Sequence, residues 1–147
     1  MIKFVVKEFK ELTIDELYSI LQLRSEVFVV EQNCVYQDLD FKDSEAIHVI
    51  GKENEKTVAY SRIFKSGDYF TKPSIGRIVV KKEHRGSSYG YQLVKESIDF
   101  IYHNFEEKSI LISAQKYLTK FYKSFGFIQQ GDEYLEDGIP HIKMLKK

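Results

Sequence analysis

The chain has 147 residues, of which 43% are hydrophobic and 30% are charged, a composition that is typical of a globular domain and argues against disorder. Its 22 lysines and arginines balance its 22 aspartates and glutamates, so it lacks the excess positive charge expected of a nucleic-acid-binding protein. Because it has no apolar run of roughly 18 residues, no recognisable signal peptide and a single cysteine, Cys34, we expect a cytoplasmic protein without membrane contact.

The hydrophobic pattern predicts strands and helices that follow each other along the chain. Residues 2–9 mix valine and phenylalanine with lysine, as in a strand, and the sequence from Thr13 to Glu16 is a capping box that starts an amphipathic helix running to about Val29. Residues 31–46 show no sustained period and are expected to form an irregular loop. Further strands are expected at 47–52, 57–64, 75–80, 110–114, 127–134 and 139–145, and further helices at 90–105 and 118–125.

Two pairs of these strands are expected to form hairpins, one across the turn at 53–56 and the other across the Glu-Asp-Gly turn at 136–138. Gly126 suits a left-handed cap that ends the last helix. The order of elements predicts an α/β (α+β) protein in which helices cover a mixed sheet, built as one domain over residues 1–147.

The turn with the sequence HRGSSYG, residues 84–90, lies between the strand at 75–80 and the helix that follows. The start of a helix has unpaired amide donors and a positive dipole end, so an anion is attracted to this place. Gly86 and Gly90 permit close approach of a ligand, and the two serines between them add hydroxyl donors. The spacing matches neither a P-loop nor the three-glycine dinucleotide fingerprint. These residues therefore indicate either a phosphate-binding turn or a plain strand-to-helix turn.

Five further sequence blocks lie at compatible spacing on both sides of this turn. They are LRSEVFVVEQNCVYQDLDFKD, AIHVIG, GRIVV, SAQKYLTKFYKSFGF and YLEDGIPHIKM, which together extend from Leu23 to Met144. With these blocks and the turn at 84–90, the chain resembles the GNAT N-acetyltransferase superfamily, and within it the ElaA-like acetyltransferases. The phosphate-binding signature of the superfamily aligns with Arg85, Ser88 and Gly90, except that a glycine is usual in place of Ser88.

The resemblance implies a GNAT-like fold with a mixed, mostly antiparallel central sheet, helices on both faces and a pair of parallel strands, 75–80 and 110–114, that splay apart. It also implies that acetyl-CoA, as acetyl donor, lies in the opening between these two strands. The residues implied to contact the donor are Ile78, Val79 and Val80 along the pantetheine arm, Arg85, Gly86, Ser87, Ser88, Tyr89 and Gly90 at the pyrophosphate, and Gln115 near the pantetheine or the acceptor.

The family's chemistry needs an acid for the departing sulfur and a base for the attacking amine. Tyr122, in the FYKSFGF block, matches the tyrosine that protonates the thiolate in many members, although packing among the 10 tyrosines and 11 phenylalanines of the chain would also explain it. Three residues are candidate bases, namely Glu31, His48 and His141. A histidine between apolar neighbours on a strand is usually structural, so the choice among the three stays open.

The acidic series Asp38, Asp40 and Asp43 fails the EF-hand pattern, because Lys42 and Asp43 stand where an oxygen ligand and a glycine are needed. We expect no metal site, and we interpret the series as a solvated loop or a negative wall that attracts a cationic amine. Arg77 is expected to pair with one acidic residue near the site. Cys34 is interpreted as a small buried thiol rather than a nucleophile.

The function implied by the resemblance is an N-acetyltransferase that moves an acetyl group from acetyl-CoA to a primary amine of a small molecule or peptide. The alternative is a protein of the same fold that binds acyl-CoA as a sensor without transferring the acyl group. The neutral net charge argues against a third possibility, nucleic-acid binding. Both a monomer and a homodimer are compatible with the sequence.

Overall fold

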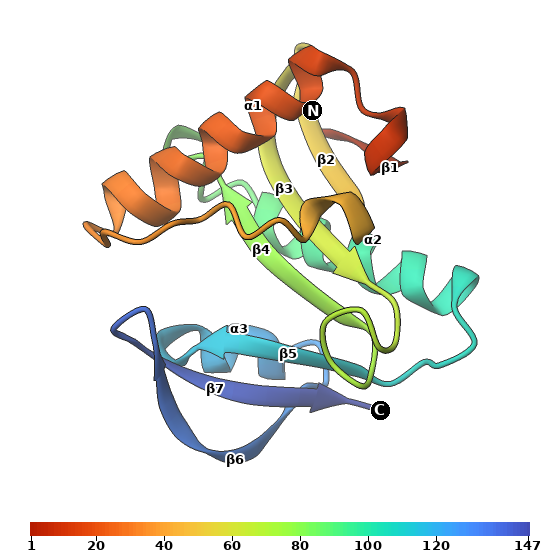
Figure 1. Ribbon diagram of the computed structural model, residues 1–147, viewed down its shortest axis with the longest axis vertical. Coiled ribbons are helices and arrows are strands. Elements are labelled where there is room, and N and C mark those ends of the chain that lie inside the picture. The colour runs from red at the N-terminus through yellow and green to blue at the C-terminus, as the bar shows by residue number, and fades with distance from the viewer.

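The computed structural model describes all residues from 1 to 147 and contains two antiparallel β-sheets with helices packed against them (Figure 1). The first sheet has the strand order β1-β2-β3-β4 and the second has the order β5-β7-β6. The strands are β1 (Lys3–Glu8), β2 (Ile47–Glu53), β3 (Lys56–Phe64), β4 (Ser74–Val80), β5 (Ile110–Gln115), β6 (Ile128–Glu136) and β7 (Ile139–Lys146). The expected combination of strands and helices is present, but the sheet is divided between β4 and β5.

Two helices cover opposite faces of the first sheet. Helix α1 (Ile14–Arg24) begins at the predicted capping box, in which the Glu16 amide donates to Thr13 Oγ1 over 3.0 Å and the Thr13 amide donates to Glu16 Oε1 over 2.9 Å. The helix continues as a π-helical segment, Ser25–Glu31. Helix α2 (Tyr89–Asn104) lies on the other face, and the short helix α3 (Thr119–Lys123) follows β5.

The hydrophobic core is divided in the same way, because neighbouring residues of a strand point to opposite faces. On the α1 face, Ile20 and Leu23 pack with Ile50 and Tyr60. On the α2 face, the core is continuous with that of the second sheet. It joins Val49, Ala59, Leu93, Val94, Ile112, Ile142 and Met144, among others. The two sheets therefore share one core beneath α2 and α3.

The strands β4 and β5 diverge from a single junction. The Leu111 amide donates to the Pro73 carbonyl over 2.9 Å at the start of both strands, and beyond it they form no ladder. A β-bulge interrupts β4 further along, since Tyr60 pairs with Val79 while Arg62 pairs with Gly76. Within this bulge Arg77 has a φ of 49°, a left-handed conformation that is costly for a residue with a side chain. The junction and the bulge together open a space between the sheets.

The turns follow the local sequence. In the β6–β7 turn both central residues, Asp137 and Gly138, have positive φ values of 52° and 77°, as a two-residue hairpin turn requires. The β2–β3 turn is built in the same way by Asn54 and Glu55, with φ values of 51° and 67°. Gly126 has a φ of 96° just after α3, which confirms its expected place as a left-handed cap.

None of the helices has the length and apolar character needed to cross a membrane.

Candidate active site

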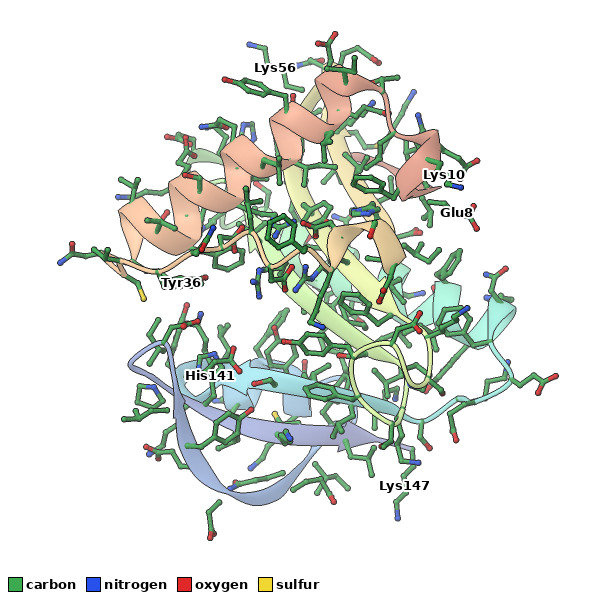
Figure 2. The ribbon with its side chains drawn as sticks, in the orientation of Figure 1. Glu8, Lys10, Tyr36, Lys56, His141 and Lys147 are labelled. Carbon is green, nitrogen blue, oxygen red and sulfur yellow. The ribbon has the colours of Figure 1, made fainter.

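A cleft lies between the diverging strands β4 and β5 and encloses about 870 Å³ of empty space, including its open mouth. Its walls come from the loop after α1, from β3 and β4, from β5 and α3, and from the β6–β7 hairpin. Figure 2 shows Tyr36 on the loop and His141 on β7, on opposite sides of this space. The cleft therefore occupies the place predicted for the donor and acceptor.

The turn at 84–90 is open to a ligand at the end of β4. The structure gives the backbone amides of residues 86–91 no hydrogen-bond partner, so a row of donors is free at the start of α2. Gly86 and Ser88 have φ values of 91° and 63°, and the strained position is the one where Ser88 replaces the usual glycine. The hydroxyl of Tyr89 donates to Glu53, so only the backbone of Tyr89 belongs to the turn.

Gly90 shows that α2, β4 and α3 meet at this turn. A Cβ atom added to Gly90 would lie 3.9 Å from Phe121 Cζ and 3.9 Å from Val80 Cγ2, which are ordinary contact distances. Packing within the protein therefore does not require a glycine here, although a glycine inside a helix is unfavourable by about 1 kcal/mol relative to alanine.

Arg85 is held by a carboxylate of the π-helical segment. Its Nη1 and Nη2 atoms lie 2.6 and 2.9 Å from the two carboxylate oxygens of Glu31, and its Nε donates to the Val80 carbonyl over 3.0 Å. These hydrogen bonds from Arg85 lower the pKa of Glu31. Glu31 lies outside the cleft lining, and a carboxylate with a lowered pKa is a poor proton acceptor, so the structure does not favour it as the base.

The side chain of Tyr122 lies at the cleft and is only 5% exposed. Burial raises its pKa, so the phenol keeps its proton at neutral pH and can donate a hydrogen bond. Gln115, at the end of β5, also lines the cleft, where its Oε1 accepts a hydrogen bond from Gln32 Nε2 over 3.4 Å. Ile78 lines the same space, whereas the side chain of Val79 packs in the core beside α1 and its backbone pairs with Tyr60 of β3.

His48 is a structural residue, in contrast to its selection as a candidate base. It is fully buried, with Nδ1 2.6 Å from the Tyr60 hydroxyl and Nε2 2.9 Å from the Asp43 carbonyl. Because a carbonyl only accepts, Nε2 carries the proton and the Tyr60 hydroxyl donates to Nδ1. Both ring nitrogens are thereby occupied away from the cleft, and burial lowers the pKa of the ring.

The third candidate base, His141, lies in the cleft lining. Its Nδ1 is 2.7 Å from the Ile139 carbonyl, so Nδ1 carries the proton in the neutral ring and Nε2 has a free lone pair. Nε2 is 3.6 Å from Glu136 Oε2, which is beyond a hydrogen bond. Of the three candidates, His141 alone combines a place in the cleft with an unoccupied acceptor atom.

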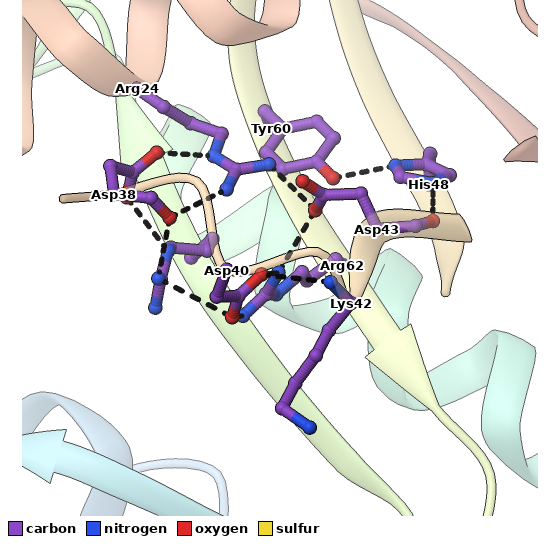
Figure 3. A network of polar contacts seen from close by, with 9 residues as sticks. Arg24, Asp38, Asp40, Lys42, Asp43, His48, Tyr60 and Arg62 are labelled. Atoms are coloured by element: carbon purple, nitrogen blue, oxygen red, sulfur yellow. Dashed lines mark hydrogen bonds and ion pairs between the residues drawn. The ribbon is translucent and has the colours of Figure 1, made fainter. Parts of the chain in front are cut away.

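The expectations for Asp38, Asp40 and Asp43 were wrong, because these residues form neither a solvated loop nor an unpaired negative surface that could attract a cationic amine. The three aspartates pair with three arginines from α1, β3 and β4 in a largely buried network (Figure 3). The ion pairs are Arg24–Asp38 at 2.8 Å, Arg24–Asp43 at 2.8 Å, Arg62–Asp43 at 2.9 Å, Arg62–Asp40 at 2.6 Å and Arg77–Asp38 at 2.8 Å. The expected acidic partner of Arg77 is thus confirmed as Asp38.

The pKa values of this network follow from its pairing. Burial by itself raises the pKa of Asp43, but hydrogen bonds and charges from Arg24 and Arg62 outweigh burial and hold that pKa below its usual value. The pKa of Asp40 is lowered for the same reason, mainly by Arg62. Asp40 and Asp43 are therefore ionised at neutral pH, and the network of three aspartates and three arginines fixes the loop 38–43 against the bulged strand.

Sequence reasoning missed the polar residues of the β6–β7 hairpin. Glu136 and Asp137 both line the cleft, and neither has a lysine or arginine partner. Both residues belong to the Glu-Asp-Gly turn, where the sequence pattern indicates only a hairpin connection. Cys34 is half-buried rather than buried, and its Sγ donates to the Asp137 carbonyl over 3.2 Å, joining the loop after α1 to this hairpin.

Two splayed parallel strands, a bulge on the first of them and a row of free amides at the start of the following helix define a GNAT-type acyltransferase fold. Comparison with known proteins agrees. Residues 8–147 match the family model of the acetyltransferase (GNAT) domain. The whole chain is 43% identical to the protein ElaA of Escherichia coli, of which it covers 97%. This chain belongs to the GNAT acetyltransferase family, in its ElaA-like branch.

Solved structures support the same relationship. The crystal structure of Escherichia coli ElaA superposes with a TM-score of 0.93 at 42% identity, over 100% of both chains. The crystal structure of an acyl-CoA N-acyltransferase from Pseudomonas aeruginosa gives a TM-score of 0.94 at 34% identity, again over 100% of both chains. The expected fold is thereby confirmed along the entire sequence.

Proposed function

We propose that this chain is an N-acetyltransferase that moves the acetyl group of acetyl-CoA directly to a primary amine of a small molecule or peptide. The observation that carries the proposal is the position of Tyr122, which lines the cleft while the preceding residue, Phe121, lies against Gly90 among the free amides of residues 86–91. A plain strand-to-helix turn does not explain a hydroxyl donor at the cleft together with free backbone amides. Transfer of an acyl group from a pyrophosphate-bearing thioester uses the hydroxyl at the sulfur and the amides at the pyrophosphate.

The residues present fit such a donor. The edge of β4 that faces away from β3, along residues Ile78, Val79 and Val80, offers main-chain groups to an extended arm, as an added strand would use them. The Val80 carbonyl is the exception, because it already accepts from Arg85. The amides of residues 86–91 and the guanidinium of Arg85 match the charge and oxygen atoms of a pyrophosphate. Acetyl-CoA would supply only the activated acetyl group, and the chain would supply binding, orientation and proton handling.

The proton balance assigns a task to two side chains. The acceptor arrives as an ammonium ion and loses two protons while its nitrogen forms a bond to the acetyl carbon and the carbon–sulfur bond breaks. His141 Nε2 accepts the first proton and passes it to solvent. The Tyr122 hydroxyl donates its proton to the departing sulfur and regains one from the acylated nitrogen, so the net release is one proton. Because the phenol is a weaker acid than a thiol, its main effect is a hydrogen bond to the developing charge.

Two measurements test this function. Calorimetric titration with acetyl-CoA should show binding to the wild type that Arg85→Ala weakens at least tenfold, while Lys95→Ala, an exposed substitution on α2, leaves it unchanged. Tyr122→Phe should retain donor binding but lower transfer to an amine about 100-fold, whereas Tyr18→Phe, on the exposed face of α1, should not. Binding without any transfer by the wild type across an amine screen would favour the sensor, and absence of donor binding would refute both.

A further inference from the structure

The face of the second sheet that borders the cleft carries a row of polar side chains. Gln115 on β5 and Tyr134 on β6 are the direct cross-strand neighbours of His141 on β7. Ser113, two residues before Gln115, lies on the same face. The opposite face of this sheet holds the apolar residues Ile112, Ala114, Ile142 and Met144, which belong to the shared core. Because these polar side chains border the cleft instead of bulk solvent, they are suited to bind a polar group of a ligand.

The uncompensated charge of the cleft is negative. The arginines of its lining, Arg62 and Arg77, are engaged by the aspartates of the loop 38–43. The carboxylates of Glu136 and Asp137 have no such partner. The attraction for a cation that sequence reasoning assigned to the acidic loop therefore belongs to the β6–β7 hairpin.

Glu136 and His141 present two hydrogen-bond acceptors to the same point. Glu136 Oε1 already accepts from Ser113 Oγ over 3.1 Å, which orients the carboxylate and leaves Oε2 free. Ser113 is in turn hydrogen-bonded to the Tyr134 hydroxyl. His141 donates through Nδ1 to the Ile139 carbonyl, so Nε2 is an acceptor as well. When the His141 ring is neutral, Nε2 and Glu136 Oε2, which lie 3.6 Å apart, are both acceptors, and a group with several N–H donors satisfies both.

We propose that the acceptor amine binds as its primary ammonium ion between Glu136 Oε2 and His141 Nε2, with Glu136 as the binding carboxylate and His141 as the proton acceptor. This assignment rests on the proposed function and narrows its substrate class. The neighbouring lining is aromatic, with Tyr36, Phe64, Tyr69 and Phe70, and it suits an apolar stem. A carboxylate beside the amine is disfavoured by Glu136 and Asp137. The acceptor class is thus a primary amine on an apolar stem without an adjacent carboxylate.

Binding can be tested on the intact chain with n-pentylamine as the probe and 1-pentanol as its uncharged counterpart. Nitrogen-15 spectra of the histidine rings should show His141 as the Nδ1–H tautomer. Pentylammonium should shift its Nε2 resonance saturably and 1-pentanol should not. Glu136→Gln should weaken this response at least tenfold, whereas Glu133→Gln, an exposed substitution on the same strand, should leave it unchanged. An unresponsive His141, an equal response to 1-pentanol, or full affinity in Glu136→Gln would overturn the proposal.

Kinetics separate the two roles once an amine is acetylated. Glu136→Gln should raise KM for the amine at least tenfold with kcat changed less than about threefold. His141→Gln should lower kcat by about 100-fold or more, which a purely structural role in ammonium binding would not do. Acetyl-CoA binding measured on the same samples distinguishes the two failures. Intact donor binding with no His141 response refutes only this inference, while loss of donor binding by the wild type refutes the proposed function itself.

Discussion

Arg85 and Glu31 form a two-point ion pair, with guanidinium nitrogens 2.6 and 2.9 Å from the two carboxylate oxygens. The pair joins the π-helical segment after α1 to the turn that precedes α2. Because Arg85 is also the side chain expected to meet a pyrophosphate, Glu31 both orients the guanidinium and competes with that ligand for its donors. The balance between these two effects can be measured.

Glu31→Gln should tighten acetyl-CoA binding by about two- to fivefold. The pair is partly exposed, and such pairs contribute up to about 1 kcal/mol, which limits what a competing anion gains when the carboxylate is removed. Calorimetric titration of the variant beside Glu83→Gln, an exposed carboxylate near the same turn, measures the effect. Weaker binding by Glu31→Gln would mean that orientation of Arg85 outweighs competition.

Ser88→Gly should stabilise the fold by about 0.5 kcal/mol and tighten donor binding. Ser88 has a φ of 63°, where a side chain costs about 1–2 kcal/mol, and the added freedom of glycine in the unfolded chain offsets part of the gain. Ser87→Gly is the matched control, because Ser87 is not in the left-handed region and should lose stability. Thermal unfolding followed by circular dichroism compares the two, and equal effects would refute the conformational explanation.

Asp43→Ala should destabilise the protein by about 3–5 kcal/mol. Its Oδ1 accepts from Arg24 at 2.8 Å and from Arg62 at 2.9 Å, and both arginines are buried, so the substitution leaves two guanidinium groups with insufficient compensation. Asp99→Ala, which removes an exposed pair within α2, should cost less than about 0.5 kcal/mol. Urea unfolding provides the comparison. A small loss for Asp43→Ala would show that the remaining aspartates rearrange.

Glu16 should make stability depend on pH below about 4.5. Burial alone would raise its pKa, but hydrogen bonds from the Thr13 amide, Lys7 and Lys52 outweigh burial and lower the pKa to about 2. A lowered pKa in the folded state means that Glu16 contributes fully above its unfolded-state pKa and that the contribution is lost as the pH falls from about 4.5 to 2.

Glu16→Gln should therefore cost about 2 kcal/mol at pH 7 and much less at pH 2. Unfolding by urea at a series of pH values measures the difference between variant and wild type. Glu11→Gln, whose carboxylate caps an exposed turn, is the control. A cost for Glu16→Gln that does not change with pH would show that packing, rather than charge, explains it.

Local features of the fold were predictable because the residues that determine them are neighbours in the sequence. The capping box at Thr13 and Glu16, the Asp137–Gly138 turn and the Gly126 cap each depend on a few adjacent residues. The division into two sheets was not predictable in this way. It depends on which strand edges remain unpaired after the bulge at Arg77, and the apolar pattern of β4 and β5 is the same whether or not they pair.

Residues of the candidate site were predictable where they belong to a sequence motif of the family. The placement of Tyr122 and Gln115 at the cleft followed from the FYKSFGF and SAQK blocks. The pairing of the three aspartates in the loop 38–43 could not be predicted from a motif. Their arginine partners are distant along the chain, and without these partners three aspartates close together in sequence resemble a solvated segment. The position of Glu136 in the cleft was not predictable either, because only the hairpin register brings this residue near His141.

The single hydrogen bond between Leu111 and Pro73 also bears on how the protein avoids aggregation. Beyond that bond the facing edges of β4 and β5 have no strand partner, and unpaired edges of this kind normally recruit strands from other molecules. Here the two edges border the cleft between the sheets, so the main-chain groups that would pair with a strand of another molecule lie where an extended ligand is expected to bind.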